Sequence, residues 1–341
     1  MVCWMVECRS RSATVLAFFA SLAVACPRAR APALTAGSAV LVIGRDHPGS
    51  KDNQFGYEGG SALRVDGLYH LFLSEMYAPP LWDGMRFGHW TSADRIHWTR
   101  ASTVFAARNA WSPVVVWDDE SDRWFLFYVQ YRWNHADEVR GQYDGTIVRL
   151  RSATQGRSGI GGPFEGRDIV MEPNVGSASW EGGQGVDSFF PYRVGDRWYA
   201  LYGSHNHAPA GAWLVGLATG TKLTSTFRRM GGSVIESFFI ENPIVTRDRH
   251  GSYLGVYDSD SSQATGVYVP DGQHIGISAS RDGLQWSPGA NIAVLPAGAA
   301  YDVRTPVSLI EEGDERYTTF FTVQRTSEPW WDVYFVELTR R

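Results

Sequence analysis

Cysteine and lysine are both scarce in this sequence. All three cysteines of the 341-residue chain lie in its first 26 residues, at Cys3, Cys8 and Cys26. A disulfide scaffold and a thiolate zinc site are therefore excluded for the rest of the chain. Lysine occurs only at Lys51 and Lys222, the formal net charge is −5, and there is no block of like charges. Neither a nucleic-acid partner nor a basic membrane-binding face is expected.

The first 31 residues have the pattern of an export signal. Two arginines precede an apolar run over residues 13–26, and Ala23-Val24-Ala25 offers the small residues of a cleavage site. The run is too short to span a bilayer as a helix. We therefore expect a signal peptide and processing region over 1–31, and an exported, secreted or periplasmic protein with no membrane span. Cys26 follows directly, so a lipid anchor there stays open beside simple cleavage.

Aromatic residues, in contrast, are plentiful and recur in phase with a repeat. The chain has 14 Trp, 15 Tyr and 17 Phe, a content typical of β-structure packed with large rings. No stretch combines a helical period with caps, whereas five strand–turn–strand units recur about every 60 residues. Each joins a buried strand to an aromatic strand through Asp, Gly or Glu, as in tight hairpins. The units cover residues 61–73, 114–128, 190–202, 243–257 and 306–321.

A second motif occurs twice in the same phase. The pattern Gly-x3-Ser-x-Asp-x3-Trp spans Gly88–Trp98 and returns three repeats later over Gly276–Trp286. Its Ser and Asp are expected to fix a turn through backbone hydrogen bonds, and its Trp to pack on an outer strand. Short strands repeating at this length predict an all-β, five-bladed β-propeller with four-stranded antiparallel blades around a central funnel. We place this single domain at residues 45–341 and expect a monomer.

The residues that enter the first strand of each blade should converge on the funnel. Three of the five entries carry a carboxylate in an apolar or glycine-rich context: Glu58, Asp187 and Glu241. Burying such a group is unfavourable unless it is paired or used. Carboxyl groups that meet in a cleft are typical of acid–base chemistry, and glycoside hydrolysis needs two of them. The plainer alternative is that each caps a strand or pairs with an arginine.

These features resemble the five-bladed glycosidases of family 43, which are related to families 32 and 68. Besides the hairpins and the Ser-x-Asp motif, the resemblance rests on Trp111-Ser112-Pro113 at blade two and Glu241-Asn242-Pro243 at blade four. It implies that Glu241 is the general acid, Asp187 the residue that adjusts the acid's pKa, and Glu58 the base. It also implies an exported hydrolase that cleaves O-glycosidic bonds of a plant- or algal-type saccharide, with inversion the expected outcome.

One departure from that family concerns the base. Glu58 stands where an aspartate is usual, and the extra methylene narrows the gap to the acid towards that of retaining enzymes. Asp52 and Asp46 therefore remain alternative bases. Three other classes also stay open: a carbohydrate-binding propeller without catalysis, a phosphorylase-type relative, and a sialidase-type propeller. The last would need an arginine cluster, and only Arg304 enters a blade.

Several further side chains are candidates for binding a carbohydrate substrate. Arg304 occupies in blade five the position of Glu241 in blade four, and would bind substrate or pair with one of the acids. Trp111 and Trp180 offer rings for stacking on a sugar, with buried packing the alternative for Trp111. His205 and His207 follow the second strand of blade three.

No cofactor is required by this chemistry, and no metal site is predicted. Residues 258–261 have the polar side chains of a calcium loop. They lack the regular ligand spacing of such a loop, so a structural calcium ion has no clear motif behind it.

Overall fold

The computed structural model describes residues 32–132, 143–174, 180–205, 213–231, 234–235, 240–259, 273–325 and 327–341. Over these ranges the chain forms 22 β-strands and three short 3-10 helices, η1 (Pro48–Ser50), η3 (Arg157–Gly161) and η4 (Gly182–Gln184). None of the helices in this part of the chain is long and apolar enough to cross a bilayer.

The first four blades are antiparallel meanders of four strands each, in chain order from one edge to the other. Blade one consists of β3 (Gly56–Val65), β4 (Leu68–Ala78), β5 (Gly84–Ser92) and β6 (Thr99–Ala106). Blade two consists of β7 (Ala110–Asp118), β8 (Arg123–Gln130), β9 (Thr146–Ser152) and β10 (Phe164–Met171). Blade three consists of β11 (Ser188–Val194), β12 (Arg197–Ser204), β13 (Leu214–Gly220) and β14 (Arg228–Arg229). Blade four consists of β15 (Ile240–Arg247), β16 (Tyr253–Ser259), β17 (His274–Ser280) and β18 (Ala290–Ala293).

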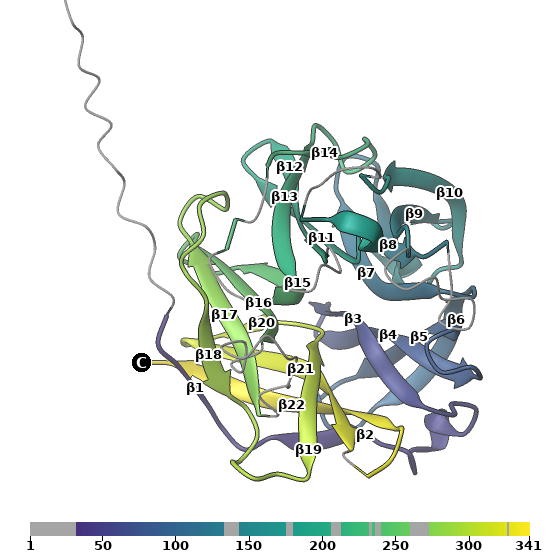
Figure 1. Cartoon of the computed structure of the whole chain (residues 1–341), viewed down its shortest axis with the longest axis vertical. Helices are drawn as coiled ribbons and strands as arrows, with labels where there is room; N and C mark the ends of the chain where they lie inside the picture. The colour runs from purple at the N-terminus through teal and green to yellow at the C-terminus, as the bar shows by residue number, and fades with distance from the viewer. Residues whose placement is uncertain are drawn as a thin grey trace, which may run out of the picture.

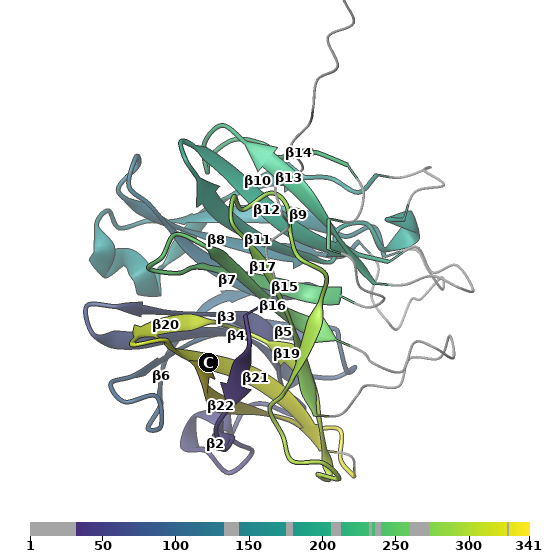
Figure 2. The ribbon, with the colours of Figure 1, turned by 90° about the vertical axis from the view of Figure 1, so that its left-hand side faces the viewer.

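Blade five is completed by the two ends of the described chain. It contains β19 (Tyr301–Pro306), β20 (Ile310–Gly313), β21 (Arg316–Arg325) and β22 (Trp331–Arg340). The short strands β1 (Leu34–Ala36) and β2 (Val40–Ile43) pair antiparallel with β22 and form its outer edge. Both lie ahead of residue 45, the predicted start of the domain, and Figures 1 and 2 show the C-terminus beside β1.

The first strands of the five blades form the inner wall. They contact one another in the order β3, β7, β11, β15, β19 and back to β3, which closes a ring. Figure 1 shows the sheets arranged around this centre. The fold is therefore a five-bladed β-propeller, and the prediction made from the hairpin repeat is confirmed.

The blades are held together by apolar side chains that fill the space between neighbouring sheets. Phe127 of blade two, for example, packs with Phe189 and Tyr202 of blade three in one buried cluster. Comparable clusters bridge the other blades. Because each sheet is packed on both faces, the positions of the inner strands relative to one another are tightly constrained.

The repeated Ser-x-Asp motif does what the sequence predicts. Asp94 Oδ1 accepts backbone N–H bonds from Ile96 and His97 at 2.9 and 2.8 Å, closing the turn after β5. Asp282 Oδ1 makes the equivalent bonds after β17, both at 2.8 Å. The two tryptophans that end the motif, Trp98 and Trp286, are buried.

We predict that closure of blade five stabilises the whole ring. Ile43 of β2 is fully buried against blade five, whereas Leu41 of the same strand is 45% exposed. Ile43→Ala should lower the free energy of unfolding by about 2–4 kcal/mol, because it leaves a cavity where β2 packs against blade five. Leu41→Ala, the matched control, should change it by no more than about 0.5 kcal/mol. Urea unfolding followed by tryptophan fluorescence measures both, and equal losses would contradict the assignment.

Candidate active site

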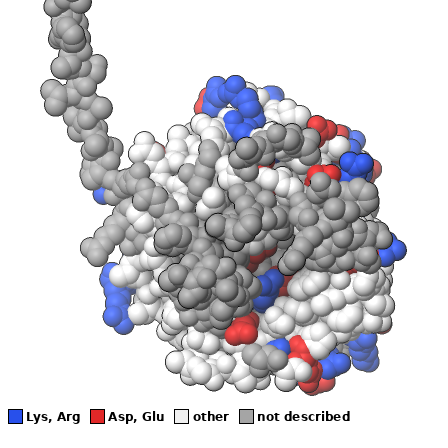
Figure 3. Space-filling view, viewed as in Figure 1, with Lys and Arg blue, Asp and Glu red and all other residues white. Residues whose placement is uncertain are grey.

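The carboxylates predicted from the sequence come together at one end of the inner strands. Glu58 lies near the start of β3, Glu241 near the start of β15, and Asp187 immediately before β11. Arg304 of β19 joins them, and these charges act on one another electrostatically. On the face shown in Figure 3, acidic and basic atoms meet near the centre.

A backbone irregularity recurs at this end of the inner strands. The pairing register shifts between Glu58 and Gly60, Trp111 and Val114, Glu241 and Ile244, and Val303 and Pro306. At three of these places one residue has positive φ: Gly59 at 64°, Ser112 at 50° and Asn242 at 48°. A bulge bends the strand and re-aims its side chains. The same bend in several blades accounts for the convergence of their entry residues.

Glu58 is held by two residues of blade five. Only 4% of Glu58 is exposed, and its Oε1 accepts a hydrogen bond from the Thr305 hydroxyl at 2.7 Å. Arg304 Nη2 lies 3.5 Å from the same oxygen. No described residue hydrogen-bonds to Oε2. Burial raises the pKa of Glu58, while Arg304 and Thr305 act to lower it.

Asp187 accepts hydrogen bonds from two residues that the sequence analysis did not select. Tyr131, directly after β8, donates its hydroxyl to Asp187 Oδ1, and Gln184 of η4 donates Nε2 to the same atom at 2.8 Å. Burial raises the pKa of Asp187, and both bonds oppose that rise. Burial and the charge of Asp187 raise the pKa of Tyr131 well above its usual value, so Tyr131 remains a donor.

Glu241 lies within hydrogen-bonding reach of Asp187. Two carboxyl groups at this range share a proton, because both cannot ionise at low cost. Burial, Asp187 and Asp258, in that order, raise the pKa of Glu241 well above its usual value, against the opposing effect of Arg304. Since Tyr131 and Gln184 stabilise the ionised form of Asp187, Glu241 is the more readily protonated of the two carboxyl groups.

A fourth carboxyl group, Asp258, completes the cluster. It lies on β16 directly opposite Glu241 and is 6% exposed. Its Oδ2 accepts a bond from Asn242 Nδ2 at 3.1 Å and lies 3.3 Å from Thr305 Oγ1. Burial raises the pKa of Asp258 well above its usual value. The sequence analysis treated this residue only as part of a polar loop, although its strand is the partner of the Glu241 strand.

The alternative bases lie elsewhere. Asp46 and Asp52 are both exposed and flank η1. Asp52 acts on Arg100, which is bound to Glu75 in a separate ion cluster. The structure therefore leaves Glu58 as the candidate base in blade one.

The candidate substrate-binding residues have different surroundings. Arg304 contacts Glu58, as one of its two predicted roles requires. Trp111 is partly buried, with its ring 5.2 Å from that of Trp82. Trp180 stacks on Tyr202 at 5.4 Å, so one face of its ring is already covered.

The two histidine candidates differ in what the structure describes. The His205 ring lies 5.2 Å from that of Trp213, and His207 lies outside the described residues. Residues 260–261 of the polar segment also lie outside them. Among the residues that are described, no group of three or more His, Cys, Asp or Glu side chains is arranged to hold a metal ion.

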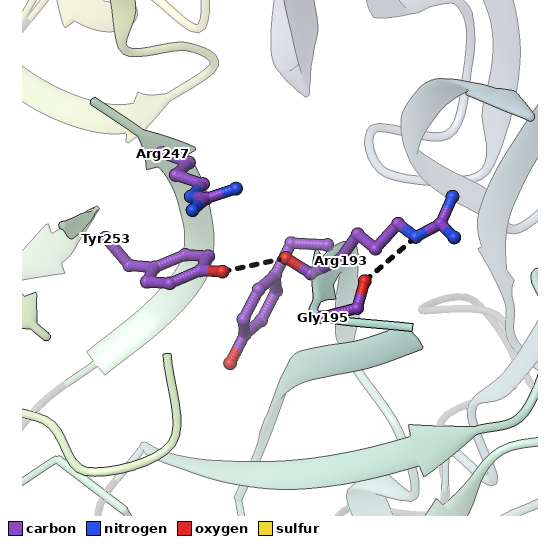
Figure 4. A pocket seen from close by; sticks show the side chains of 5 residues that line it. Arg193, Gly195, Arg247 and Tyr253 are labelled. Carbon is purple, nitrogen blue, oxygen red and sulfur yellow. Dashed lines mark hydrogen bonds between the residues drawn. The ribbon is translucent and has the colours of Figure 1, made fainter. Parts of the chain in front are cut away.

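A pocket lies at the C-terminal ends of β11 and β15, away from the carboxyl cluster, and its lining differs. Its volume is about 470 Å³, and it is lined by Tyr192, Arg193, Gly195, Arg247 and Tyr253. Figure 4 shows the Tyr253 hydroxyl bonded to the Arg193 carbonyl, at 3.0 Å. No carboxylate lines this pocket, so it offers no acid–base pair. The carboxylate end of the funnel is the better candidate for catalysis.

Comparison with known proteins supports the fold. No family model matches the sequence, and no curated protein is similar to it. A family 117 glycoside hydrolase from the marine bacterium Zobellia galactanivorans aligns with a TM-score of 0.61 at 11% identity, over 90% of each chain. An α-L-arabinofuranosidase from Podospora anserina, solved with cellotriose, aligns with a TM-score of 0.61 at 13% identity, over 91% of this chain and 98% of its own. A thermostable family-43 glycoside hydrolase gives 0.53 at 12%, over 84% and 89%.

These structures are five-bladed propellers, and one of them belongs to family 43, the family that the sequence resembles. The predicted resemblance is thus confirmed for the fold. At such low identity the likeness does not carry residue roles, which depend on the geometry of this chain.

We predict that the buried carboxyl cluster destabilises the protein as the pH rises. The pKa of Glu241 is higher in the folded chain than its ordinary value of 4.5, so the folded state binds this proton more tightly. Its contribution to stability is then fully present below about pH 4.5 and is lost as the pH rises towards the folded-state pKa. Glu241→Gln should therefore have a higher melting temperature than the wild type at neutral pH, with the difference shrinking in acid.

Thermal unfolding between acid and neutral pH measures this effect. Glu165→Gln, which removes an exposed carboxylate on β10, is the matched control and should follow the wild-type curve. A Glu241→Gln curve parallel to that of the wild type would show that Glu241 is already ionised in the folded protein.

Proposed function

We propose that this protein is a glycoside hydrolase that cleaves O-glycosidic bonds of a plant- or algal-type saccharide. The observation that carries the proposal is the meeting of Glu58, Asp187 and Glu241 at one end of the funnel, with different hydrogen-bond partners around each. Glu241 forms a hydrogen bond with Asp187, and its pKa is raised well above its usual value, while Glu58 has a cation and a hydroxyl at one oxygen and no hydrogen bond from a described residue at the other. Such a pair is what hydrolysis of a glycosidic bond requires.

The reaction follows from these states. Glu241 donates its proton to the glycosidic oxygen as the bond from that oxygen to the anomeric carbon breaks. Glu58 takes a proton from a water molecule, whose oxygen forms the new bond to the anomeric carbon. The products are an alcohol and a free sugar, and Glu241 regains a proton as Glu58 releases one.

Asp187 supports the acid. Its negative charge is the largest electrostatic contribution raising the pKa of Glu241 and thereby keeps the acid protonated until the leaving oxygen approaches. Tyr131 and Gln184 favour the ionised form of Asp187 by donating hydrogen bonds to it. These roles are the ones that the family resemblance implies: Glu241 is the acid, Asp187 adjusts the pKa of the acid, and Glu58 is the base.

Inversion is the proposed stereochemical outcome. Thr305 and Arg304 both contact Oε1 of Glu58, which draws the longer side chain towards blade five. We infer that this position offsets the added methylene, so that a water molecule fits between base and substrate. Proton NMR of the first anomer released tests the proposal.

The proposed setting is outside the cytoplasm. The amino-terminal pattern of residues 1–31 predicts export, and a polymeric saccharide is the expected substrate there. The protein is proposed to act as a monomer without a cofactor.

We predict that loss of the acid removes most of the activity. Glu241→Gln keeps the size of the side chain but cannot donate a proton to the leaving oxygen, so kcat should fall by about 10²–10⁴-fold on substrates with poor leaving groups. Aryl glycosides, whose leaving groups need little protonation, should be affected far less. The measurement is sugar release from arabinosides, xylosides, fructans and galactosides, with Glu165→Gln as the unaffected control.

Unchanged rates in Glu241→Gln would contradict the role of Glu241. If the wild type binds one of these saccharides in a calorimeter but releases no product, the protein is a carbohydrate-binding propeller. Product formation that requires phosphate would indicate a phosphorylase.

We also predict the direction in which Asp187 shifts the pH profile. Asp187→Asn removes the charge that raises the pKa of Glu241, so the alkaline limb of kcat/KM should move to lower pH. Asp196→Asn, at the exposed β11–β12 hairpin, is the control and should leave the limb in place. A limb that stays in place in both variants would exclude Asp187 as the group that adjusts the acid.

A further inference from the structure

The mechanism above leaves one buried carboxyl group unused. Asp258 lies on β16 opposite Glu241 and is 6% exposed. It is bound through Oδ2 to Asn242, and its Oδ1 has no hydrogen-bond partner among the described residues. A charged carboxylate with so few donors is unfavourable in a buried position.

The hydroxyl of Thr305 lies between this group and the base. Thr305 Oγ1 is 2.7 Å from Glu58 Oε1 and 3.3 Å from Asp258 Oδ2. A hydroxyl has one hydrogen to donate and lone pairs with which to accept. The shorter contact makes Glu58 the acceptor of that hydrogen. The contact with Asp258 is then a hydrogen bond only if Asp258 supplies the proton.

The other contacts of Asp258 agree with this direction. Asn242 Oδ1 accepts a bond from the Ser112 hydroxyl at 3.2 Å, so its Nδ2 faces Asp258 as a donor, at 3.1 Å. Donation thus runs one way, from Asn242 to Asp258, to Thr305 and to Glu58. Hydrogen bonds arranged in one direction polarise and strengthen one another.

The charge balance of the cluster points the same way. Four carboxyl groups meet there, and Arg304 is the cation that acts on Glu58, Glu241 and Asp258. Four negative charges in this partly to fully buried cluster would repel strongly, and within the described ranges Arg304 is a cation that acts on three of them. With Glu241 and Asp258 protonated, two carboxylates remain, Glu58 and Asp187, and each of them receives hydrogen-bond donors.

We propose that Asp258 is a neutral carboxylic acid in the resting protein and that, through the Thr305 hydroxyl, it positions Glu58 and keeps it ionised. The inference rests on the proposed function, in which Glu58 is the base. Asp258 is a positioning residue, because it acts on the base through Thr305. Blade four thereby supplies both the acid and the support for the base of blade one.

The first test compares two substitutions of Asp258. Asp258→Asn keeps a neutral side chain that can donate to Thr305, so kcat/KM should fall less than about tenfold and the acid limb of the pH profile should stay in place. Asp258→Ala removes the donor, so kcat/KM should fall about 10–100-fold. Its acid limb should move to higher pH, because a weaker hydrogen bond stabilises ionised Glu58 less.

The intervening hydroxyl provides a second, independent pair. Thr305→Val removes the donor to Glu58 and should shift the acid limb upwards at least as far as Asp258→Ala does. Thr305→Ser retains the hydroxyl and should keep the limb near its wild-type position. If Thr305→Val leaves the limb in place, the connection through Thr305 is wrong.

The protonation state is measured without reference to activity. In a difference infrared spectrum at neutral pH, wild type minus Asp258→Asn, the C=O band of a protonated carboxylic acid should appear. Asp332→Asn is the control, because Asp332 is buried but ion-paired with Arg325 at 2.8 Å and should contribute no such band. Absence of the band from the Asp258 difference spectrum would overturn the proposal even if the activity assays failed.

The outcomes separate this inference from the proposed function. If Glu58→Gln lowers kcat by about 10²–10⁴-fold and Asp258→Asn does not, both stand. If Asp258→Asn is as damaging as Glu58→Gln, Asp258 is itself an ionised base and the inference is wrong, while the glycosidase function remains. If the wild type releases no sugar from any glycoside, the proposed function fails, and the infrared spectrum alone decides the state of Asp258.

Discussion

The proposed chemistry of this propeller depends on holding four carboxyl groups close together in a cluster of buried and half-buried side chains. Charges of like sign at this density are tolerated only if some carry protons and the others receive donors. The structure meets both conditions with residues from several blades: Tyr131 and Gln184 donate to one carboxylate, and Thr305 and Arg304 contact another. In the proposed mechanism, the distribution of protons, and with it the division into acid and base, follows from which carboxyl groups have donors.

The fold and the three entry carboxylates were accessible from the sequence because both follow the repeat. Every hairpin has the same pattern of buried and aromatic positions. Aligning the five copies therefore also aligns the residues that enter the first strand of each blade. That reasoning placed Glu58, Asp187 and Glu241 in one funnel, where the structure has them. It predicts only the position of these residues in the blade; their protonation depends on neighbours from other blades.

The features that the sequence analysis missed are at positions that the alignment of the five repeats does not compare. Asp258 sits on the second strand of its blade, and its importance comes from the residue it faces across the sheet. Tyr131 and Gln184 lie in connections whose paths are not set by the repeat. The closing strands β1 and β2 have three and four residues, too short to show a period. Tyr131 and the closing strands depend on contacts between distant segments, whereas Asp258 and Gln184 depend on local geometry that the repeat does not encode.

Closure of the ring by its amino-terminal strands also has a kinetic consequence. Thr35 bonds to the backbone of Thr339, and the two positions are 304 residues apart. Closing so long a loop adds little to the equilibrium cost, which grows only with the logarithm of length, but contacts of such separation form late in folding. Four blades can assemble from hairpins that are adjacent in the sequence, whereas the fifth blade is complete only when β1 and β2 pair with β22. The pairing of β1 and β2 with β22 in blade five is therefore expected to be the last part of the fold to form and the first to open.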